Sequence, residues 1–289
     1  MLWVNAVVQG ILLGGLYALF ACGLSLVFGV MRIVNLAHGD FAVVAAFIAF
    51  SLTGVFNGSV LTAAIVVIPL FAAFGYALHR LLLARAITVG PLSTLLATFG
   101  LSVVIQNLLL QIYSPDTHSL NIGSLSSSSI KITSQISIST LSLATFGLAV
   151  AVLIGLQLFL TRSQPGRMMR ASADDPGAVR LVGGNTSHLY AMAMAIAFGT
   201  IALAGLLFAM HSSFDPSIGP TRLIFAFEAV VIGGLGSLWG TLVGGIVLGL
   251  AQTLFGQIDT GWTLLGGHLI FLAVLAFRPQ GILPARSVA

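Results

Sequence analysis

The stretch that decides the fold is residues 1–31, MLWVNAVVQGILLGGLYALFACGLSLVFGVM, which contains no Asp, Glu, Lys or Arg. Stretches without these four residue types recur along the whole chain, at 41–79, 86–115, 132–161, 181–214, 229–258 and 260–277. A charged side chain at the centre of a bilayer is costly, and about 20 apolar residues in a helix span the hydrocarbon core. The pattern therefore predicts a polytopic membrane protein.

The composition supports the same class of protein. Hydrophobic residues make up 58% of the chain and charged residues only 6%, against about 25% charged residues in soluble domains. Because lipid offers the backbone no hydrogen-bond partners, spanning segments form helix bundles or closed barrels. A barrel requires alternating positions, whereas runs such as 61–83 are apolar on every side. We therefore expect an all-α polytopic membrane protein with a single transmembrane domain over residues 1–289.

The apolar runs predict the number of helices. They lie at 6–30, 40–56, 60–84, 91–113, 140–161, 188–211, 225–257 and 261–278. The run 225–257 is too long for one ordinary span, and Gly233-Gly234-Leu235-Gly236-Ser237 interrupts it. It forms either two short crossings or a re-entrant half-helix followed by a crossing. We expect a bundle of about eight or nine transmembrane helices with a broken or re-entrant segment.

The arginines indicate the orientation of the chain. Those that follow the first, third, fifth and last runs share one face if residues 225–257 cross twice: Arg32, Arg80, Arg85, Arg162, Arg167, Arg170, Arg180, Arg278 and Arg286. Cytoplasmic loops are enriched in Lys and Arg, so we expect the N-terminus outside and the C-terminus in the cytoplasm. The arginines between the apolar runs account for the net charge of +4, so this charge does not indicate a nucleic-acid partner. No basic region precedes the first run, so we expect no cleaved signal peptide.

The external loop 114–139 is long enough for recognition. It is rich in serine, and it contains IKIT at 130–133 and ISIS at 136–139. This alternation is typical of short half-buried strands in a small hairpin, and an irregular polar loop fits the sequence equally well.

The cytoplasmic loop 162–188 carries the capping signals of a short helix. Asp175 before Pro176 is an N-cap with proline at the first helical position, and Gly183 or Gly184 supplies a left-handed C-cap about two turns later. A helix of two turns is marginal alone in water, so we expect it to dock against a partner. The alternative is a solvated connector.

The junction between the first two runs is unusually polar. Arg32, Asn35, His38 and Asp40 lie within nine positions at the membrane boundary. Polar groups at that depth need partners or water. Either Asn35 and His38 line a pathway in a broken helix, or the segment is an interfacial turn in which Arg32 faces lipid phosphates and Asp40 caps the next helix. The residues favour the two interpretations equally.

Two further features lie late in the chain. Gly236, Gly240 and Gly244 recur every four residues, a spacing that allows close helix packing in lipid. Glu228 is the only Glu and lies three residues into an apolar run, where an acid is by default a candidate functional residue. We slightly favour the alternative that Glu228 lies at the interface and pairs with Arg222.

The sequence excludes several kinds of chemistry. Lys131 is the only lysine, so the chain has no phosphate-binding loop and cannot hydrolyse ATP itself. No paired carboxylates or nucleophile elbow occur, the histidines have no metal-ligand spacing, and Cys22 is the only cysteine. We therefore expect no enzyme, no cofactor and no metal site.

Three motifs in this order resemble the branched-chain amino acid ABC-importer permeases, specifically the smaller, LivH-type permease subunit. They are NLAHG at 35–39 after GGLYAL at 14–19, DDPGAVRLVG at 174–183, and GGLGSLWG at 233–240, and RPQGIL at 278–283 is similar to the family's usual ending. The resemblance covers essentially the whole chain. It implies an ATP-driven importer that moves branched-chain or related small amino acids across the bacterial cytoplasmic (inner) membrane.

The resemblance also implies roles for individual residues. The family's ATPase-coupling segment corresponds to Asp174, Asp175, Pro176, Ala178, Val179, Arg180, Leu181 and Gly183. We assign the translocation pathway to Asn35, His38, Gly39, Asp40 and Glu228. Gly184 stands where the family usually has a branched apolar residue, and we expect it to loosen the end of the coupling helix.

The resemblance implies an assembly with several partners. This chain and a larger paralogue would form the pathway, two cytoplasmic ATPases would drive it, and a periplasmic or surface binding protein would deliver the substrate. The family also includes urea and short-chain amide permeases, which remain an alternative. A cation-coupled secondary transporter would need intramembrane acids, and only Asp40, Glu228 and Asp259 lie near spans. No catalytic constellation supports an intramembrane enzyme.

Overall fold

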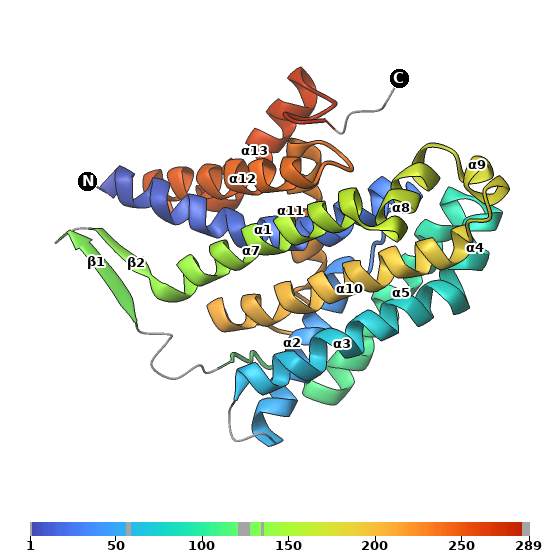
Figure 1. Ribbon diagram of the computed structural model, residues 1–289. Helices are drawn as coiled ribbons and strands as arrows, with labels where there is room; N and C mark the ends of the chain where they lie inside the picture. Colours follow the sequence, from blue (N-terminus) through green and yellow to red (C-terminus); the bar gives the residue numbers. More distant parts are fainter. Residues whose placement is uncertain (1, 56–58, 121–127, 134–135, 285–289) are drawn as a thin grey trace.

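The protein is a bundle of apolar helices with a small hairpin at one end (Figure 1). The computed structural model describes all residues except 1, 56–58, 121–127, 134–135 and 285–289. The helices are α1 (Leu2–Met31), α2 (His38–Val55), α3 (Val60–Leu78), α4 (Ala84–Val89), α5 (Pro91–Tyr113), α7 (Thr140–Arg162), α8 (Gln164–Asp174), α9 (Pro176–Leu181), α10 (Thr186–His211), α11 (Gly219–Gly233), α12 (Leu238–Ile258) and α13 (Trp262–Phe277). The π-helical turn His79–Leu83 joins α3 and α4 into one rod. The predicted all-helical membrane architecture is confirmed.

Six of the described helical segments are long and apolar enough to cross a membrane: α1, the α3–α4 rod, α5, α7, α10 and α12. The helices α2 and α13 are apolar but shorter. The predicted total of about eight crossings therefore requires α2 and α13 to cross as well, and a total of about nine also requires α11.

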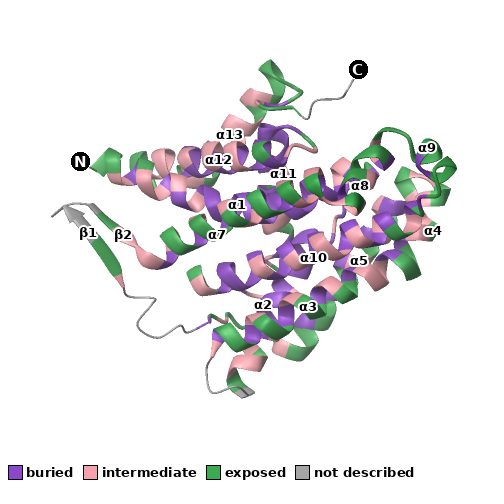
Figure 2. Ribbon diagram, viewed as in Figure 1, coloured by how far each residue is buried: buried purple, intermediate pink, exposed green. Residues whose placement is uncertain are grey.

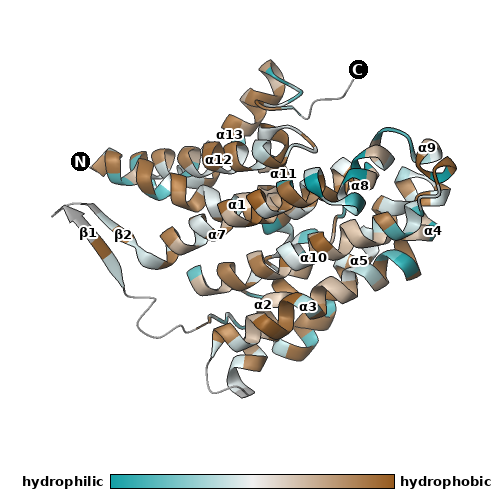
Figure 3. Cartoon of the chain, in the orientation of Figure 1, coloured by the Kyte–Doolittle hydropathy of each residue, from teal (hydrophilic) through white to brown (hydrophobic). Residues whose placement is uncertain are grey.

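The centre of the bundle is α1, which packs antiparallel to α12. In the apolar stretch of α1, 83% of the residues are buried, against 22% in α5, and Figure 2 shows the same contrast. The close approach depends on glycine, because a Cβ at Gly14 would overlap the backbone of Ile246 and a Cβ at Gly245 would overlap the carbonyl oxygen of Gly14. Small residues allow such contacts in lipid, where van der Waals packing holds helices together. Figure 3 shows that the helices are largely hydrophobic, and many large apolar residues of α3, α5, α7 and α13 are exposed.

The helix α2 begins inside the bundle rather than at its surface. The chain leaves α1 at Met31, reverses at Arg32, which has φ 54°, and runs without helical structure to the start of α2 at His38. The ring of His38 reaches the carbonyl oxygen of Phe20, about three turns before the end of α1. The segment between the two helices therefore turns back into the bundle.

The predicted interruption near residues 233–237 is present. The helix α11 ends at Gly233, and α12 begins at Leu238. The turn between them needs glycine at two positions, because Gly234 has φ 114° and Gly236 has φ 79°. The first of these helices begins at Gly219, earlier than the run 225–257 indicated, because residues 219–224 continue the helix beyond the apolar pattern.

The loop 114–139 contains the predicted hairpin. Strands β1 (Ser129–Thr133) and β2 (Ile136–Ser139) pair antiparallel, with Ile130 opposite Ile138. Earlier in the loop, His118 and Phe214 exchange two backbone hydrogen bonds of 2.8 Å. This loop is thereby fastened to the extended chain between α10 and α11.

Candidate translocation and coupling sites

The polar break between α1 and α2 is buried. Asn35, His38 and Asp40 are each 1% exposed. The Oδ1 atom of Asn35 accepts a hydrogen bond from the backbone nitrogen of Ala37 (3.1 Å), and Nε2 of His38 donates to the carbonyl oxygen of Phe20 (2.8 Å). The first contact is a local turn that an Asn side chain commonly makes with the backbone two residues on. It sets the direction in which the chain enters α2.

Asp40 lies in the first turn of α2 and does not cap this helix. Its Oδ1 atom accepts a hydrogen bond from Nε2 of Gln106 (3.0 Å), which also donates to Ser102 Oγ (3.0 Å). Its Oδ2 atom is buried and has no hydrogen-bond partner among the described residues. Asp40 therefore does not cap α2, in contrast to the interpretation of this segment as an interfacial turn, and its carboxyl group lies within the bundle. Arg32 is exposed.

The first turns of α2 and α11 meet. A Cβ at Gly39 would overlap the carbonyl oxygen of Gly219, and a Cβ at Gly219 would overlap Asp40. Two helices that both begin inside the bundle thus abut at a pair of glycines. From this junction α11 reaches to the start of α12, where Gly233 packs against Gly240.

Glu228 is not paired with Arg222, and that part of the prediction is wrong. Its Oε1 atom lies 2.5 Å from Nδ1 of His268 on α13, and the residue is 3% exposed. Glu228 lies in the second half of α11, away from the Asp40 end of this helix. The five residues assigned to the pathway therefore form two separate groups, one at the start of α11 and one in its second half.

Arg222 is the functional candidate that the sequence interpretation missed. Its guanidinium carbon Cζ lies 4.0 Å from the centroid of the Phe208 ring and 5.7 Å from the centroid of the Phe225 ring. None of the described residues forms an ion pair with Arg222. The signal was present in the sequence, because Arg222 is the only Lys or Arg in residues 181–277.

The expected short helix in the loop 162–188 is α9. Asp175 Oδ1 accepts hydrogen bonds from the backbone nitrogens of Gly177 (2.7 Å) and Ala178 (3.0 Å), as an N-cap does. Gly183 has φ 83° and ends the segment in the left-handed conformation. Figure 1 places α8 and α9 at the end of the bundle opposite to the N-terminus and the hairpin.

The residues of this segment have different surroundings. Val179 is 4% exposed, and Nε of Arg180 donates to Thr186 Oγ1 (3.1 Å). Leu181 is 90% exposed and Val182 is 81% exposed, which is unusual for apolar side chains at the end of a helix. The remaining predicted coupling residues Asp174, Asp175, Pro176, Ala178 and Gly183 are also exposed.

Gly184 does not loosen this helix, in contrast to our expectation. Its backbone nitrogen donates to the carbonyl oxygen of Val179 (2.8 Å), and a Cβ there would overlap the side chains of Val179 and Met168. The glycine lets the chain fold tightly over α9, so a branched residue would not fit this conformation.

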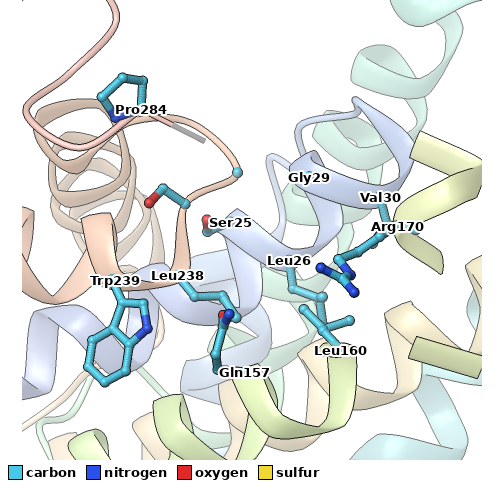
Figure 4. A pocket seen from close by; sticks show the side chains of 12 residues that line it. Ser25, Leu26, Gly29, Val30, Gln157, Leu160, Arg170, Leu238, Trp239 and Pro284 are labelled. Carbon is cyan, nitrogen blue, oxygen red and sulfur yellow. The ribbon is translucent and has the colours of Figure 1, made fainter. Parts of the chain in front are cut away.

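A cavity of about 560 Å³ lies at the same end of the bundle (Figure 4). It lies between α1, α7, α8 and the start of α12, with Arg170 and Trp239 on opposite sides and Gln157 between them. Gly236 lines this cavity from the turn before α12 and is not part of a helix. Gly240 and Gly244 pack against the backbone of α11 at Gly233 and Ala229.

These features define a class of protein: an all-helical, multi-pass membrane protein with broken helices in its interior and a short capped helix at one end. The sequence profile of the family described as "branched-chain amino acid transport system / permease component" matches residues 6–276. The chain therefore belongs to this family of permeases of ABC import systems for branched-chain amino acids, which are transport components and not enzymes.

Curated relatives match along nearly the whole chain. The high-affinity branched-chain amino acid transport system permease protein BraD of Pseudomonas aeruginosa is 30% identical over 97% of this chain and 95% of its own length. The corresponding protein LivH of Escherichia coli is 27% identical over 95% of this chain and 93% of its own. The solved structure of PsaBC from Streptococcus pneumoniae in complex with Fab covers 96% of this chain and 91% of that chain, with a TM-score of 0.51 and 14% identity. This last similarity concerns the fold alone.

Proposed function

We propose that this chain is one of two permease subunits in an importer of the bacterial cytoplasmic (inner) membrane, and that separate ATPases drive it. The observation that carries the proposal is α9, a capped helix that presents Leu181 and Val182 to solvent. A chain without a phosphate-binding loop needs an ATPase partner, and exposed apolar side chains on a small rigid helix fit a groove in such a partner. Two ATPases, a larger paralogous permease and an external binding protein complete the proposed assembly.

The proposed topology has nine crossings, with α2, α11 and α13 included. One end of the bundle carries α8, α9 and the end of α1, and the other carries the start of α1 and the hairpin, where Nε2 of Gln9 donates to the carbonyl oxygen of Ser137 (3.1 Å). The arginine-rich end is cytoplasmic by the positive-inside rule. The N-terminus is then outside and the C-terminus inside.

We propose that the pathway borders the junction of α2 and α11. The polar break holds Asn35, His38, Gly39 and Asp40, and Glu228 lies in the second half of α11. Burying polar groups in the interior of a membrane protein costs free energy. Such groups usually line a substrate path or a water-filled cavity and seldom face lipid. The burial of Asn35, His38 and Asp40 corresponds to a closed pathway, which opens when α2 and α11 separate.

The test of this function is uptake by the complete complex in proteoliposomes. With a leucine-loaded binding protein and ATP, we expect accumulation of labelled leucine that excess valine inhibits and that urea and acetamide leave unchanged. Uptake of urea instead of leucine would assign the chain to the urea branch of the family. Uptake that needs an ion gradient and no ATP would contradict the proposal.

The pathway assignment is tested separately with Asn35. The variant Asn35→Leu removes the acceptor for Ala37 and should slow leucine uptake by about tenfold or more, the factor that about 1.4 kcal/mol represents. Asn35→Ser keeps an oxygen acceptor for the Ala37 nitrogen without adding a buried charge, and it serves as the matched control. Uptake at the wild-type rate in Asn35→Leu would show that the break is not on the pathway.

A further inference from the structure

Arg222 is a cation without a matching anion. Its Nε atom is buried and has no hydrogen-bond partner, and no ion pair reaches its guanidinium from the described residues. The rings of Phe208 and Phe225 are its close contacts. Cation–π contacts recover only part of the hydration that a guanidinium loses. The guanidinium of Arg222 can therefore still donate hydrogen bonds to an anionic group.

The position of Arg222 is inside the bundle and toward the proposed external side. Phe208 lies within one turn of the end of α10 at His211, and His211 contacts Thr145 in the second turn of α7. Both of these helices are candidate spans. An arginine in such a place normally faces a water-filled path or a partner group rather than lipid.

The surface next to Arg222 is open and polar. Ser213, Ser217 and Thr221 are exposed, and Arg222 itself is half-buried. These residues lie on the lead-in to α11 and on its first turn, close to the junction with α2. A polar exposed strip beside membrane-crossing helices is suited to a pathway that a second permease subunit closes.

An anionic group lies on the same segment at a fixed position. Asp215 Oδ1 accepts hydrogen bonds from the backbone nitrogen of Ser217 (2.9 Å) and from its hydroxyl (2.5 Å). The backbone links the two charged residues, because the backbone nitrogen of Ile218 donates to the carbonyl oxygen of Asp215 (3.4 Å) and that of Arg222 donates to the carbonyl oxygen of Ile218 (3.2 Å). Asp215 forms no ion pair with Arg222. The segment thus holds the guanidinium of Arg222 and the carboxylate of Asp215 close together but not paired with each other. Such an arrangement of opposite charges complements a zwitterion.

We propose that Arg222 and Asp215 bind the α-carboxylate and the α-ammonium of the transported amino acid as it leaves the binding protein. The planar guanidinium suits a carboxylate because it can donate two parallel hydrogen bonds, and stacking on Phe208 fixes its plane. This inference rests on the proposed function and narrows its substrate class to molecules with a carboxylate. Urea and simple amides can accept a hydrogen bond from Arg222 but carry no negative charge to pair with its guanidinium.

The first experiment compares variants of the full complex in proteoliposomes with leucine-loaded binding protein. Arg222→Gln should lower leucine uptake by about tenfold or more, whereas Arg222→Lys, which keeps the charge, should retain part of it. Stimulation of ATP hydrolysis by the binding protein should persist in both variants. Arg85→Gln removes an exposed arginine of the opposite face and should transport normally.

The second experiment measures occupancy of the site directly and does not depend on the folding of an Arg222 variant. In the otherwise wild-type complex, Thr221→Cys should react with maleimide, because Thr221 is exposed. Cys22 is buried and should give no background. Leucine without binding protein should slow the reaction, and leucinamide or urea at equal concentration should not. Asp215→Asn should weaken the protection by leucine.

The outcomes separate this inference from the proposed function. If the wild-type complex imports no leucine, the proposed function fails. If the wild type imports leucine and Arg222→Gln does so at the same rate, only the inference fails. Equal protection of Thr221→Cys by leucine and leucinamide would likewise overturn it, because the carboxylate would then contribute nothing.

Discussion

The ring of His38 donates a hydrogen bond from Nε2 to the carbonyl oxygen of Phe20, 2.8 Å away, and this contact holds the start of α2 against the middle of α1. A carbonyl oxygen can only accept, so Nε2 carries the proton. The Nδ1 atom is buried and has no partner among the described residues. One directional contact therefore places the His38 ring.

Replacement of His38 should destabilise the junction of α1 and α2. We expect His38→Leu to lower the free energy of unfolding by about 1–3 kcal/mol, because it removes the hydrogen bond and changes the shape of a buried site. His38→Gln retains a donor and should lose less. Thermal unfolding in detergent measures both, and equal stability of His38→Leu and wild type would contradict the role of the contact.

Leu181 should be the residue through which α9 engages an ATPase. Because it is 90% exposed, Leu181→Asp leaves the fold intact and should abolish the stimulation of ATP hydrolysis by the binding protein. Val179→Asp is a poorer probe, since Val179 is 4% exposed and the change would disrupt the loop itself. Co-purification of the ATPases with Leu181→Asp at wild-type yield and full stimulation would argue against docking through α9.

The glycines of α12 provide a matched test of packing. A Cβ at Gly244 would overlap the carbonyl oxygen of Ala229, whereas a Cβ at Gly147 on α7 meets nothing within 4 Å. Gly244→Ala should therefore destabilise the protein by about 1–3 kcal/mol, the usual effect of overpacking. Gly147→Ala should be neutral or slightly stabilising, as alanine is the better helix former. Thermal unfolding of both variants decides the matter.

Glu228 and His268 should be energetically coupled. A double-mutant cycle with Glu228→Gln and His268→Gln should give a coupling free energy of about 0.5–3 kcal/mol, as found for residues in direct contact. The cycle that combines Glu228→Gln with Arg222→Gln should give a value near zero. The opposite result would restore the pairing of Glu228 with Arg222 that the sequence suggested.

The orientation can be measured with single cysteines. Ser137 and Asn185 are both exposed and lie at opposite ends of the bundle. In intact cells without an outer-membrane barrier, an impermeant maleimide should label Ser137→Cys and leave Asn185→Cys unlabelled until the membrane is opened. Cys22 is fully buried and gives no background. Reversed labelling would place the N-terminus in the cytoplasm.

Much of the helical architecture could be predicted from the sequence, because long charge-free runs have few other solutions in lipid. The predicted run 91–113 coincides with α5, and the run 140–161 ends one residue before α7 does. The caps of α9 were also predictable, since Asp175, Pro176 and Gly183 act through neighbouring backbone groups. Helix caps depend only on residues that are close in the sequence, so a short stretch of sequence is enough to predict them.

The contacts between distant residues could not be predicted. A helix that is apolar on every side has no amphipathic pattern, so its sequence does not indicate which face is buried or which helix each face contacts. The partner of Glu228 is His268, 40 residues further along the chain, and the partner of His38 is a backbone carbonyl that any residue could supply. For the same reason Arg222 was paired with the nearest acid in the sequence and not recognised as a group of its own.

The paired backbone of His118 and Phe214 has a mechanical consequence. Two hydrogen bonds of 2.8 Å join the loop 114–139 to the extended chain that leads into α11, and Phe214 is fully buried. Only residues 215–218 separate this pairing from the first turn of α11. We therefore expect a displacement of the loop at His118 to move the start of α11 as well.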